Sequence, residues 1–165
     1  MNNLGLGFIG IGIMGLSLVR RLCYLDYKIG AYDKNFEKLE QLKKISNIKL
    51  NQNASEISKN NDIIILCLDK TESVKEVVFG KDGIVNTANN NTIILDLSTT
   101  LANETIEFAN QLKKTGASWI DAPVSGGPDK ALEGNLAIMV GGDEKVVELS
   151  LIHISSPRDQ LQSRL

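Results

Sequence analysis

The sequence predicts an α/β fold with a doubly wound, mostly parallel sheet and helices on both faces. Two observations carry this prediction. Short apolar runs alternate with amphipathic segments along most of the 165 residues, and such alternation is typical of βαβ units with right-handed crossovers. The first apolar run also ends in Gly10-Ile11-Gly12-Ile13-Met14-Gly15, a G-x-G-x-x-G pattern between a strand and a helix.

Seven short runs have the composition of β-strands. The first is apolar on both faces, as expected of a central parallel strand covered by helices on each side. The predicted strands are residues 5–9, 28–32, 48–50, 63–68, 92–97, 118–121 and 136–140.

Six segments between these runs have the apolar spacing of amphipathic helices. In the first, Met14, Leu18, Leu22 and Leu25 recur every three or four residues. The predicted helices are residues 14–25, 36–44, 54–59, 73–79, 102–114 and a segment from 144 onward.

The glycine pattern indicates a site for a dinucleotide phosphate. Gly10 permits the tight turn, Gly12 lets a pyrophosphate approach the backbone because it has no Cβ, and Gly15 lets the helix pack close to the strand. The free N–H groups and positive dipole end of the helix would face the phosphates. Glycines at strand–helix turns are often only structural, so neighbouring residues have to support the functional interpretation.

Asp33 gives that support, because it ends the second apolar run about 20 residues beyond the glycines. An acid there accepts hydrogen bonds from both ribose hydroxyls of NAD and repels the 2′-phosphate of NADP. Lys34 complicates the prediction, since a neighbouring cation partly compensates the repulsion. Asp33 also has a purely structural interpretation, as a turn residue before Asn35, which is a candidate helix cap. We expect NAD as the cofactor, with NADP less favoured.

Three further strand ends carry polar residues. Asp69 follows the fourth run, Ser98 and Thr99 follow the fifth, and Ser125-Gly126-Gly127 lies beyond the sixth. The carboxyl ends of parallel strands share one edge of a sheet, so we expect these residues near Gly12. Ser98 and Thr99 are equally candidates for capping the next helix. Ser125-Gly126-Gly127 is either an ordinary loop or a row of free N–H groups suited to a carboxylate.

Composition and charge argue against several function classes. The net charge is −2 without a long basic run, so a nucleic-acid partner is not indicated, and no apolar stretch has the length of a membrane span. Cys23 and Cys67 lie in apolar patterns and are expected to be buried thiols of a reducing compartment. No export signal is visible, so we expect a cytoplasmic protein. His153 is the single histidine; we expect no metal site and no catalytic role for it.

Three motifs, taken in order, resemble the β-hydroxyacid dehydrogenases, the family of 3-hydroxyisobutyrate dehydrogenase and tartronate semialdehyde reductase (2-hydroxy-3-oxopropionate reductase). The family's cofactor signature is similar to GFIGIGIMG at residues 7–15, and its D-x-S-T segment to DLSTT at 96–100. Its substrate-binding segment is similar to DAPVSGGPDKALEGNLAIMVGG at residues 121–142. The resemblance covers residues 4 to about 148.

The resemblance implies reversible hydride transfer between NAD and a small 3-hydroxy acid or semialdehyde, by an enzyme that is a homo-oligomer at full length. It implies that the cofactor is bound by Gly10, Ile11, Gly12, Ile13, Met14, Gly15, Asp33, Leu68, Asp69 and Thr99. It implies that the substrate carboxylate is bound by Ser98, Ser125, Gly126 and Gly127. Asp69 departs from the family pattern, which has Leu-Pro at residues 68–69, and Ala102 stands where the family often has proline.

The same resemblance implies a proton-donating lysine in a G-x-x-x-K-x-x-x-N segment that leads into a helical C-terminal domain. No such segment follows Gly142, and Lys145 is expected to face solvent. We therefore expect residues 1–148 to form the dinucleotide-binding domain, without the lysine and with little or no activity. Residues 149–165 resemble a translated sequencing adapter, so we expect a non-native or disordered tail; a divergent natural terminus is the alternative.

Two other functions stay open at this point. The chain is alternatively a non-catalytic NAD-binding module. It is also similar in its first motif to the 6-phosphogluconate dehydrogenases, which match the DAPVSGG segment less well and would take a larger substrate.

Overall fold

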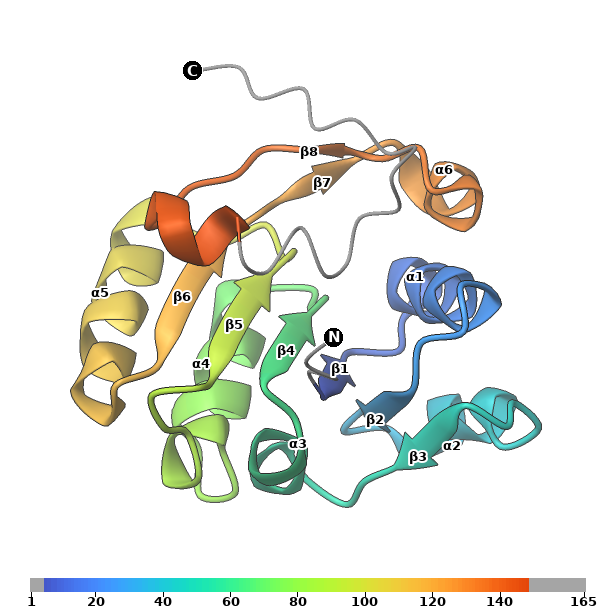
Figure 1. Ribbon diagram of the computed structural model, residues 1–165, viewed down its shortest axis with the longest axis horizontal. Helices are drawn as coiled ribbons and strands as arrows, with labels where there is room; N and C mark the ends of the chain where they lie inside the picture. The colour runs from blue at the N-terminus through green and yellow to red at the C-terminus, as the bar shows by residue number, and fades with distance from the viewer. Residues whose placement is uncertain (1–4, 149–165) are drawn as a thin grey trace.

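A six-stranded sheet forms the centre of the computed structural model, which describes residues 5–148 (Figure 1). The strands lie in the order β3-β2-β1-β4-β5-β6, and every neighbouring pair is parallel. This is the strand order of a Rossmann-type doubly wound sheet, so the predicted fold class is confirmed. The prediction of a non-native or disordered tail at residues 149–165 lies outside the described residues.

The six strands form where the first six apolar runs predict them, and most are trimmed to the residues that pair. Their bounds are β1 (Leu6–Ile9), β2 (Ile29–Tyr32), β3 (Ile48–Leu50), β4 (Ile63–Leu66), β5 (Ile93–Asp96) and β6 (Ser118–Asp121). The residues lost from the ends of β4 and β5 become the loops beyond the carboxyl edge.

The main helices also follow the prediction, with two differences. They are α1 (Ile13–Tyr24), α2 (Phe36–Leu39), α3 (Ala54–Asn60), α4 (Thr71–Phe79) and α5 (Ala102–Leu112). The predicted helices 36–44 and 102–114 end as short 3₁₀ turns, η1 (Glu40–Leu42) and η3 (Lys113–Thr115), and a further turn is η2 (Ile84–Asn86). Asn35 caps α2 as predicted, its Oδ1 accepting the Glu37 N–H at 3.0 Å. Residues 144–148 are helical.

The seventh predicted strand does not join the parallel sheet. It is reduced to β8 (Ala137–Ile138), which pairs antiparallel with β7 (Val124–Ser125) in a separate two-stranded ribbon. Gly126 and Gly127, which follow β7, adopt positive φ angles. The short helix α6 (Gly127–Glu133) follows, and it packs against α1 (Figure 1). Sequence reasoning missed β7 and α6 because segments of two and seven residues carry little periodicity.

Alternate residues of each central strand face opposite layers of helices. Phe8, Ile65 and Leu95 belong to the apolar cluster that contains α1 and α2 residues. Their neighbours Ile9, Ile64 and Ile94 belong to the cluster beneath α3, α4 and α5. Burial on both faces explains why the strands are continuous apolar runs rather than alternating ones.

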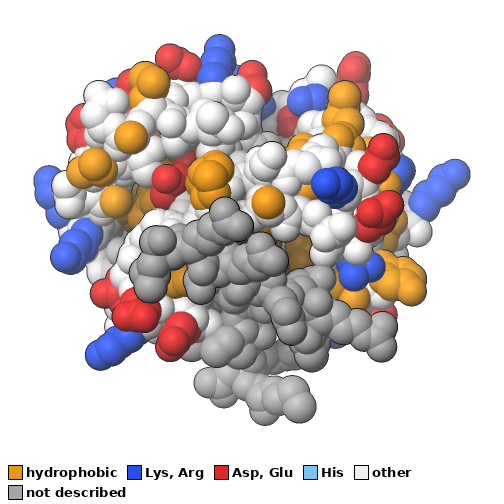
Figure 2. Space-filling model, turned by 90° about the horizontal axis from the view of Figure 1, so that it is seen from above, with side chains coloured by type: hydrophobic (Ala, Val, Ile, Leu, Met, Phe, Trp, Pro, Cys, Tyr) orange, Lys and Arg blue, Asp and Glu red, His pale blue; other side chains and the backbone are white. Residues whose placement is uncertain are grey.

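The surface is mixed in charge. On the face seen from above, Lys and Arg side chains are interspersed with Asp and Glu side chains around the rim (Figure 2). No helix among residues 5–148 is long and apolar enough to cross a membrane. Cys23 and Cys67 are free thiols.

Candidate functional site

The loop from β1 to α1 has the geometry predicted for its three glycines. Gly10 adopts φ +102°, and a Cβ there would overlap the carbonyl oxygen of Cys67 on the neighbouring strand end. A Cβ on Gly15 would overlap the carbonyl oxygen of Gly10. At Gly12 a Cβ would meet no atom within 4 Å. Gly10 and Gly15 are therefore required by the fold itself, whereas Gly12 keeps space open in front of the helix.

Asp33 fastens this loop from the end of β2. Its Oδ2 accepts the Ile11 N–H at 2.6 Å, and its Oδ1 accepts the Asn35 N–H at 2.8 Å. The Lys38 ammonium lies 3.7 Å from Oδ2, and the side chain is almost fully buried, with the residue 7% exposed. The structural interpretation of Asp33 as a turn residue is thus confirmed. These contacts are compatible with the proposed binding of a ribose, because a carboxylate has about four acceptor positions.

The opposite wall comes from the end of β4 and the start of α4. Cys67 and Leu68 follow β4, and the Asp69 carboxylate accepts the Ser73 hydroxyl at 2.7 Å. This hydrogen bond lowers the pKa of Asp69. Burial, and then the charge of Asp96, raise the pKa of the Cys67 thiol to about 11. Cys67 is therefore a protonated thiol near neutral pH and not a nucleophile.

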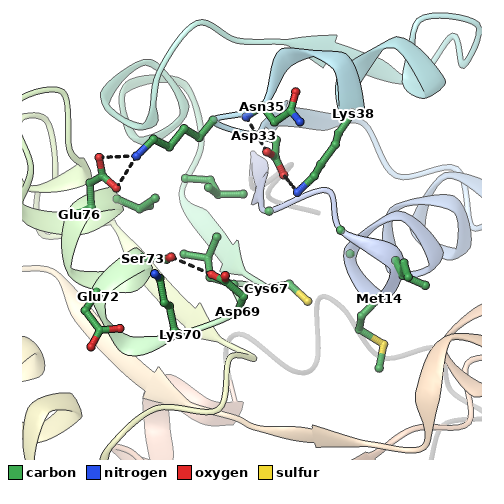
Figure 3. Close-up of a pocket in the computed structure, with 18 residues that line it drawn as sticks. Met14, Asp33, Asn35, Lys38, Cys67, Asp69, Lys70, Glu72, Ser73 and Glu76 are labelled. Carbon is green, nitrogen blue, oxygen red and sulfur yellow. Dashed lines mark hydrogen bonds and ion pairs between the residues drawn. The ribbon is translucent and has the colours of Figure 1, made fainter.

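The two walls line a cavity of about 610 Å³, within the size range of small-molecule sites. Figure 3 shows Asp33 and Lys38 on one side of it and Asp69, Ser73 and Glu76 on the other. Met14 lies on the first turn of α1. The predicted cofactor residues that line it are Gly10, Gly12, Ile13, Met14, Gly15, Asp33, Leu68 and Asp69.

The remaining predicted cofactor residues lie outside this lining. Ile11 is a buried residue of the glycine loop, and its N–H is donated to Asp33 Oδ2. Thr99 is exposed beyond β5. Conversely, several lining residues were not singled out from the sequence, among them Lys38, Ser73 and Glu76. They lie on helices that follow strand ends. Such a helix begins at the same edge of the sheet as the site, and this is the signal by which its residues could have been predicted to line the cavity.

Ser98 joins the ends of β4 and β5. Its hydroxyl accepts the Leu68 N–H at 3.0 Å, its own N–H is donated to Asp96 Oδ1 at 3.0 Å, and the residue is 2% exposed. The predicted capping of the next helix is wrong for both Ser98 and Thr99, because the residue at the cap position of α5 is Leu101 and no side chain caps that helix.

Asp96 lies beneath Ser98 as a buried carboxyl group. Burial raises its pKa to about 6, against the opposing effect of its hydrogen bonds with Ser98. The charge of Asp121, its register partner on β6, raises that pKa further. Asp96 Oδ2 has no hydrogen-bond partner among the described residues.

The predicted carboxylate site at Ser125-Gly126-Gly127 lies at the end of β7. Ser125 and Gly126 are exposed, and Gly126 and Gly127 adopt φ +139° and +80°. None of the three lines the cavity between β2 and α4. Lys145 is exposed, as predicted. Among residues 5–148, no group of three or more His, Cys, Asp or Glu side chains is placed to hold a metal ion.

A glycine loop at the start of α1, an acid at the end of β2 and a cavity between the strand ends define a dinucleotide-binding α/β domain. Residues 5–152 match the family described as the NAD binding domain of 6-phosphogluconate dehydrogenase. The chain belongs to this family, and as part of it the resemblance to the β-hydroxyacid dehydrogenases is confirmed.

Individual relatives agree with this assignment. The chain is 36% identical over 143 residues to 2-hydroxy-3-oxopropionate reductase of Escherichia coli, covering 87% of this chain and 48% of the relative. It is 33% identical over 138 residues to mouse mitochondrial 3-hydroxyisobutyrate dehydrogenase, covering 84% and 41%. A solved structure of Psf3 in complex with NADP+ and 2-OPP superposes with a TM-score of 0.85 at 25% identity, covering 90% and 52%. The chain thus spans about half the length of these relatives.

Proposed function

We propose that this chain is the cofactor-binding part of an NAD-dependent oxidoreductase that interconverts a small 3-hydroxy acid and its semialdehyde, of the 3-hydroxyisobutyrate or tartronate semialdehyde type. The observation that carries the proposal is that the Asp33 carboxylate and the unobstructed Gly12 line the same cavity. The names of the relatives support the substrate class.

The described residues fit a dinucleotide. Gly12 leaves free space where a pyrophosphate would approach the backbone, and the amino end of the twelve-residue helix α1 begins there with its dipole favouring an anion. Asp33 would hold the adenosine ribose, while Leu68 and Asp69 line the opposite wall. Thr99 lies on the loop after β5, and we propose that it also contacts the cofactor. When bound, the cofactor supplies the hydride chemistry, and the protein orients it.

Asp33 is expected to make NAD the better ligand. In calorimetric titrations of the 165-residue chain, we expect NAD to bind about tenfold more tightly than NADP, since one carboxylate near a 2′-phosphate costs on the order of 1.4 kcal/mol. Asp33→Asn should bring the two dissociation constants closer together. The matched control is Asp62→Asn, because Asp62 Oδ2 also accepts a backbone N–H, that of Gly5 at 2.8 Å, but just before β4, at the amino edge of the sheet. A preference for NADP in the unsubstituted chain would refute this role of Asp33.

The substrate carboxylate is proposed to meet Ser98 and the segment Ser125–Gly127. The resemblance implies that a lysine in a G-x-x-x-K-x-x-x-N segment moves the hydroxyl proton. Residues 143–165 contain no such segment. We therefore propose that the 165-residue chain binds the cofactor but turns over slowly or not at all, because an unassisted proton transfer forfeits a factor of about 10²–10⁴. A steady-state assay with 3-hydroxyisobutyrate or tartronate semialdehyde tests this, and near-normal turnover would contradict it.

A second candidate is a 6-phosphogluconate dehydrogenase-type activity, which the description of the matching family favours. A third is a non-catalytic NAD-binding module. Binding of 6-phosphogluconate in preference to 3-hydroxyisobutyrate by the cofactor-loaded chain would support the second candidate over the proposal. If neither acid binds while NAD does, the binding module is the better description.

A further inference from the structure

An ion pair joins the two walls of the cofactor cavity. The Lys34 ammonium contacts both carboxylate oxygens of Glu76 at 2.9 Å. Lys34 is the second residue after β2, and Glu76 lies on α4, 42 residues further along the chain. Both residues line the cavity, and Figure 3 shows Glu76 on α4 across the cavity from Asp33, with a dashed line for each of its two contacts. The pair therefore determines where the cation beside Asp33 points.

The position of this cation bears on the choice between NAD and NADP. Lys34 is the immediate neighbour of the acid proposed to hold the adenosine ribose, and a free ammonium there would attract a 2′-phosphate. Lys38, the other lysine close to Asp33, lies 3.7 Å from its carboxylate and is balanced by it. The hydrogen bond and the charge of Glu76 raise the pKa of Lys34, so the ammonium stays protonated.

We propose that Glu76 is a specificity-determining residue that holds the Lys34 ammonium away from the ribose and thereby strengthens the preference for NAD over NADP. This inference rests on the proposed cofactor site. Glu76 acts through Lys34: it pairs with the ammonium that a 2′-phosphate would otherwise contact. Because both side chains are mostly exposed, at 77% and 60%, the pair is weak enough to open and its effect is screened by salt.

The test measures the dissociation constants of NAD and NADP for the 165-residue chain by calorimetry at low ionic strength. In Glu76→Gln, we expect the ratio of the NADP to the NAD dissociation constant to fall by about two- to fivefold, which lies within the range that the loss of an exposed ion pair allows. Glu72→Gln is the matched control, because it removes the same charge from the same cavity-lining helix. Glu72 itself has no ion pair among the described residues. Its ratio should change by less than half as much.

A double substitution separates the two partners. If Glu76 acts by holding Lys34, Glu76→Gln should change the ratio far less in a Lys34→Gln background than in the unsubstituted chain. An unchanged ratio in Glu76→Gln, or an equal change in both backgrounds, would overturn the inference while leaving the proposed cofactor site intact. If the unsubstituted chain binds neither dinucleotide, the proposed function and this inference are both wrong.

Discussion

The two ends of the candidate site differ in how they are held. The glycine loop, residues 10–15, is fixed from several sides: Gly10 and Gly15 leave no room for a side chain, and Asp33 holds the Ile11 N–H. The segment Ser125–Gly127 is exposed at Ser125 and Gly126, and its shape depends on its own positive φ angles. The end that would take the cofactor is therefore built into the sheet, whereas the end that would take the substrate carboxylate lies on a short ribbon beside it.

The strongest test of this difference is at the glycine loop. Gly15→Ala should lower the free energy of unfolding by about 3 kcal/mol, because a new Cβ would overlap the Gly10 carbonyl and overpacking of this kind costs about 1–3 kcal/mol or more. Gly12→Ala is the control: with open space around Gly12, unfolding should change by less than about 0.5 kcal/mol. Urea denaturation measures both.

Gly12→Ala also separates stability from binding. Its methyl group would occupy the space proposed for the pyrophosphate, so NAD affinity should fall by about tenfold or more while the fold is retained. Unaltered NAD binding in Gly12→Ala would show that the space at Gly12 is not used by a pyrophosphate and that the glycine pattern serves the fold alone.

The next largest effect is expected at Asp96, beneath the loop that carries Ser98. Its pKa is raised to about 6, so the folded state binds a proton more tightly than the unfolded state, and stability falls as pH rises from about 4 to about 6. Asp96→Asn should remove this fall and stabilise the fold by about 2 kcal/mol at pH 7. Thermal unfolding between pH 4 and pH 7 measures it.

The control for Asp96 is Asp121, its register partner on β6. Burial also raises the pKa of Asp121, but that side chain is only partly buried, so Asp121→Asn should change the pH dependence less. An equal pH slope in Asp96→Asn and the unsubstituted chain would show that the Asp96 carboxyl group is better solvated than its burial indicates.

A smaller effect is expected at Ser98. Ser98→Ala removes the acceptor of the Leu68 N–H and should cost about 1 kcal/mol, the usual contribution of one hydrogen bond. Its control is Thr99→Ala, since Thr99 is the exposed neighbour on the same loop. Equal losses of stability in the two variants would argue against Ser98 as the link between the β4 and β5 loops.

The smallest effect on stability is expected at Ser125. Because Ser125 is exposed, Ser125→Ala should change the free energy of unfolding by less than about 0.5 kcal/mol. If the segment holds a carboxylate, the same substitution should weaken the binding of 3-hydroxyisobutyrate to the NAD-loaded chain, as measured by calorimetry. A stability loss as large as that of Ser98→Ala would show that the two ends of the site are held alike, contrary to the comparison above.

Much of the nucleotide site was predictable because its determinants are local. The tight fit at Gly10 and Gly15 and the open space at Gly12 follow from the geometry of a strand–helix turn, and the position of Asp33 follows from the length of one βαβ unit. The strands could be found because burial on both faces requires continuous apolar runs. The short ribbon β7–β8 could not, since two paired residues leave no periodic pattern to detect.

The sequence by itself determined the parallel sheet, the glycine loop and the acid at the end of β2, because steric limits and hydrophobic periodicity act over neighbouring residues. Only the tertiary structure decided which groups from neighbouring strand ends and helices meet. The Asp33 contact with the Ile11 N–H, the Ser98 contact with the Leu68 N–H and the Lys34–Glu76 pair each join separate strand ends or helices. Such contacts depend on how adjacent parallel strands, about 4.8 Å apart, bring their following loops together.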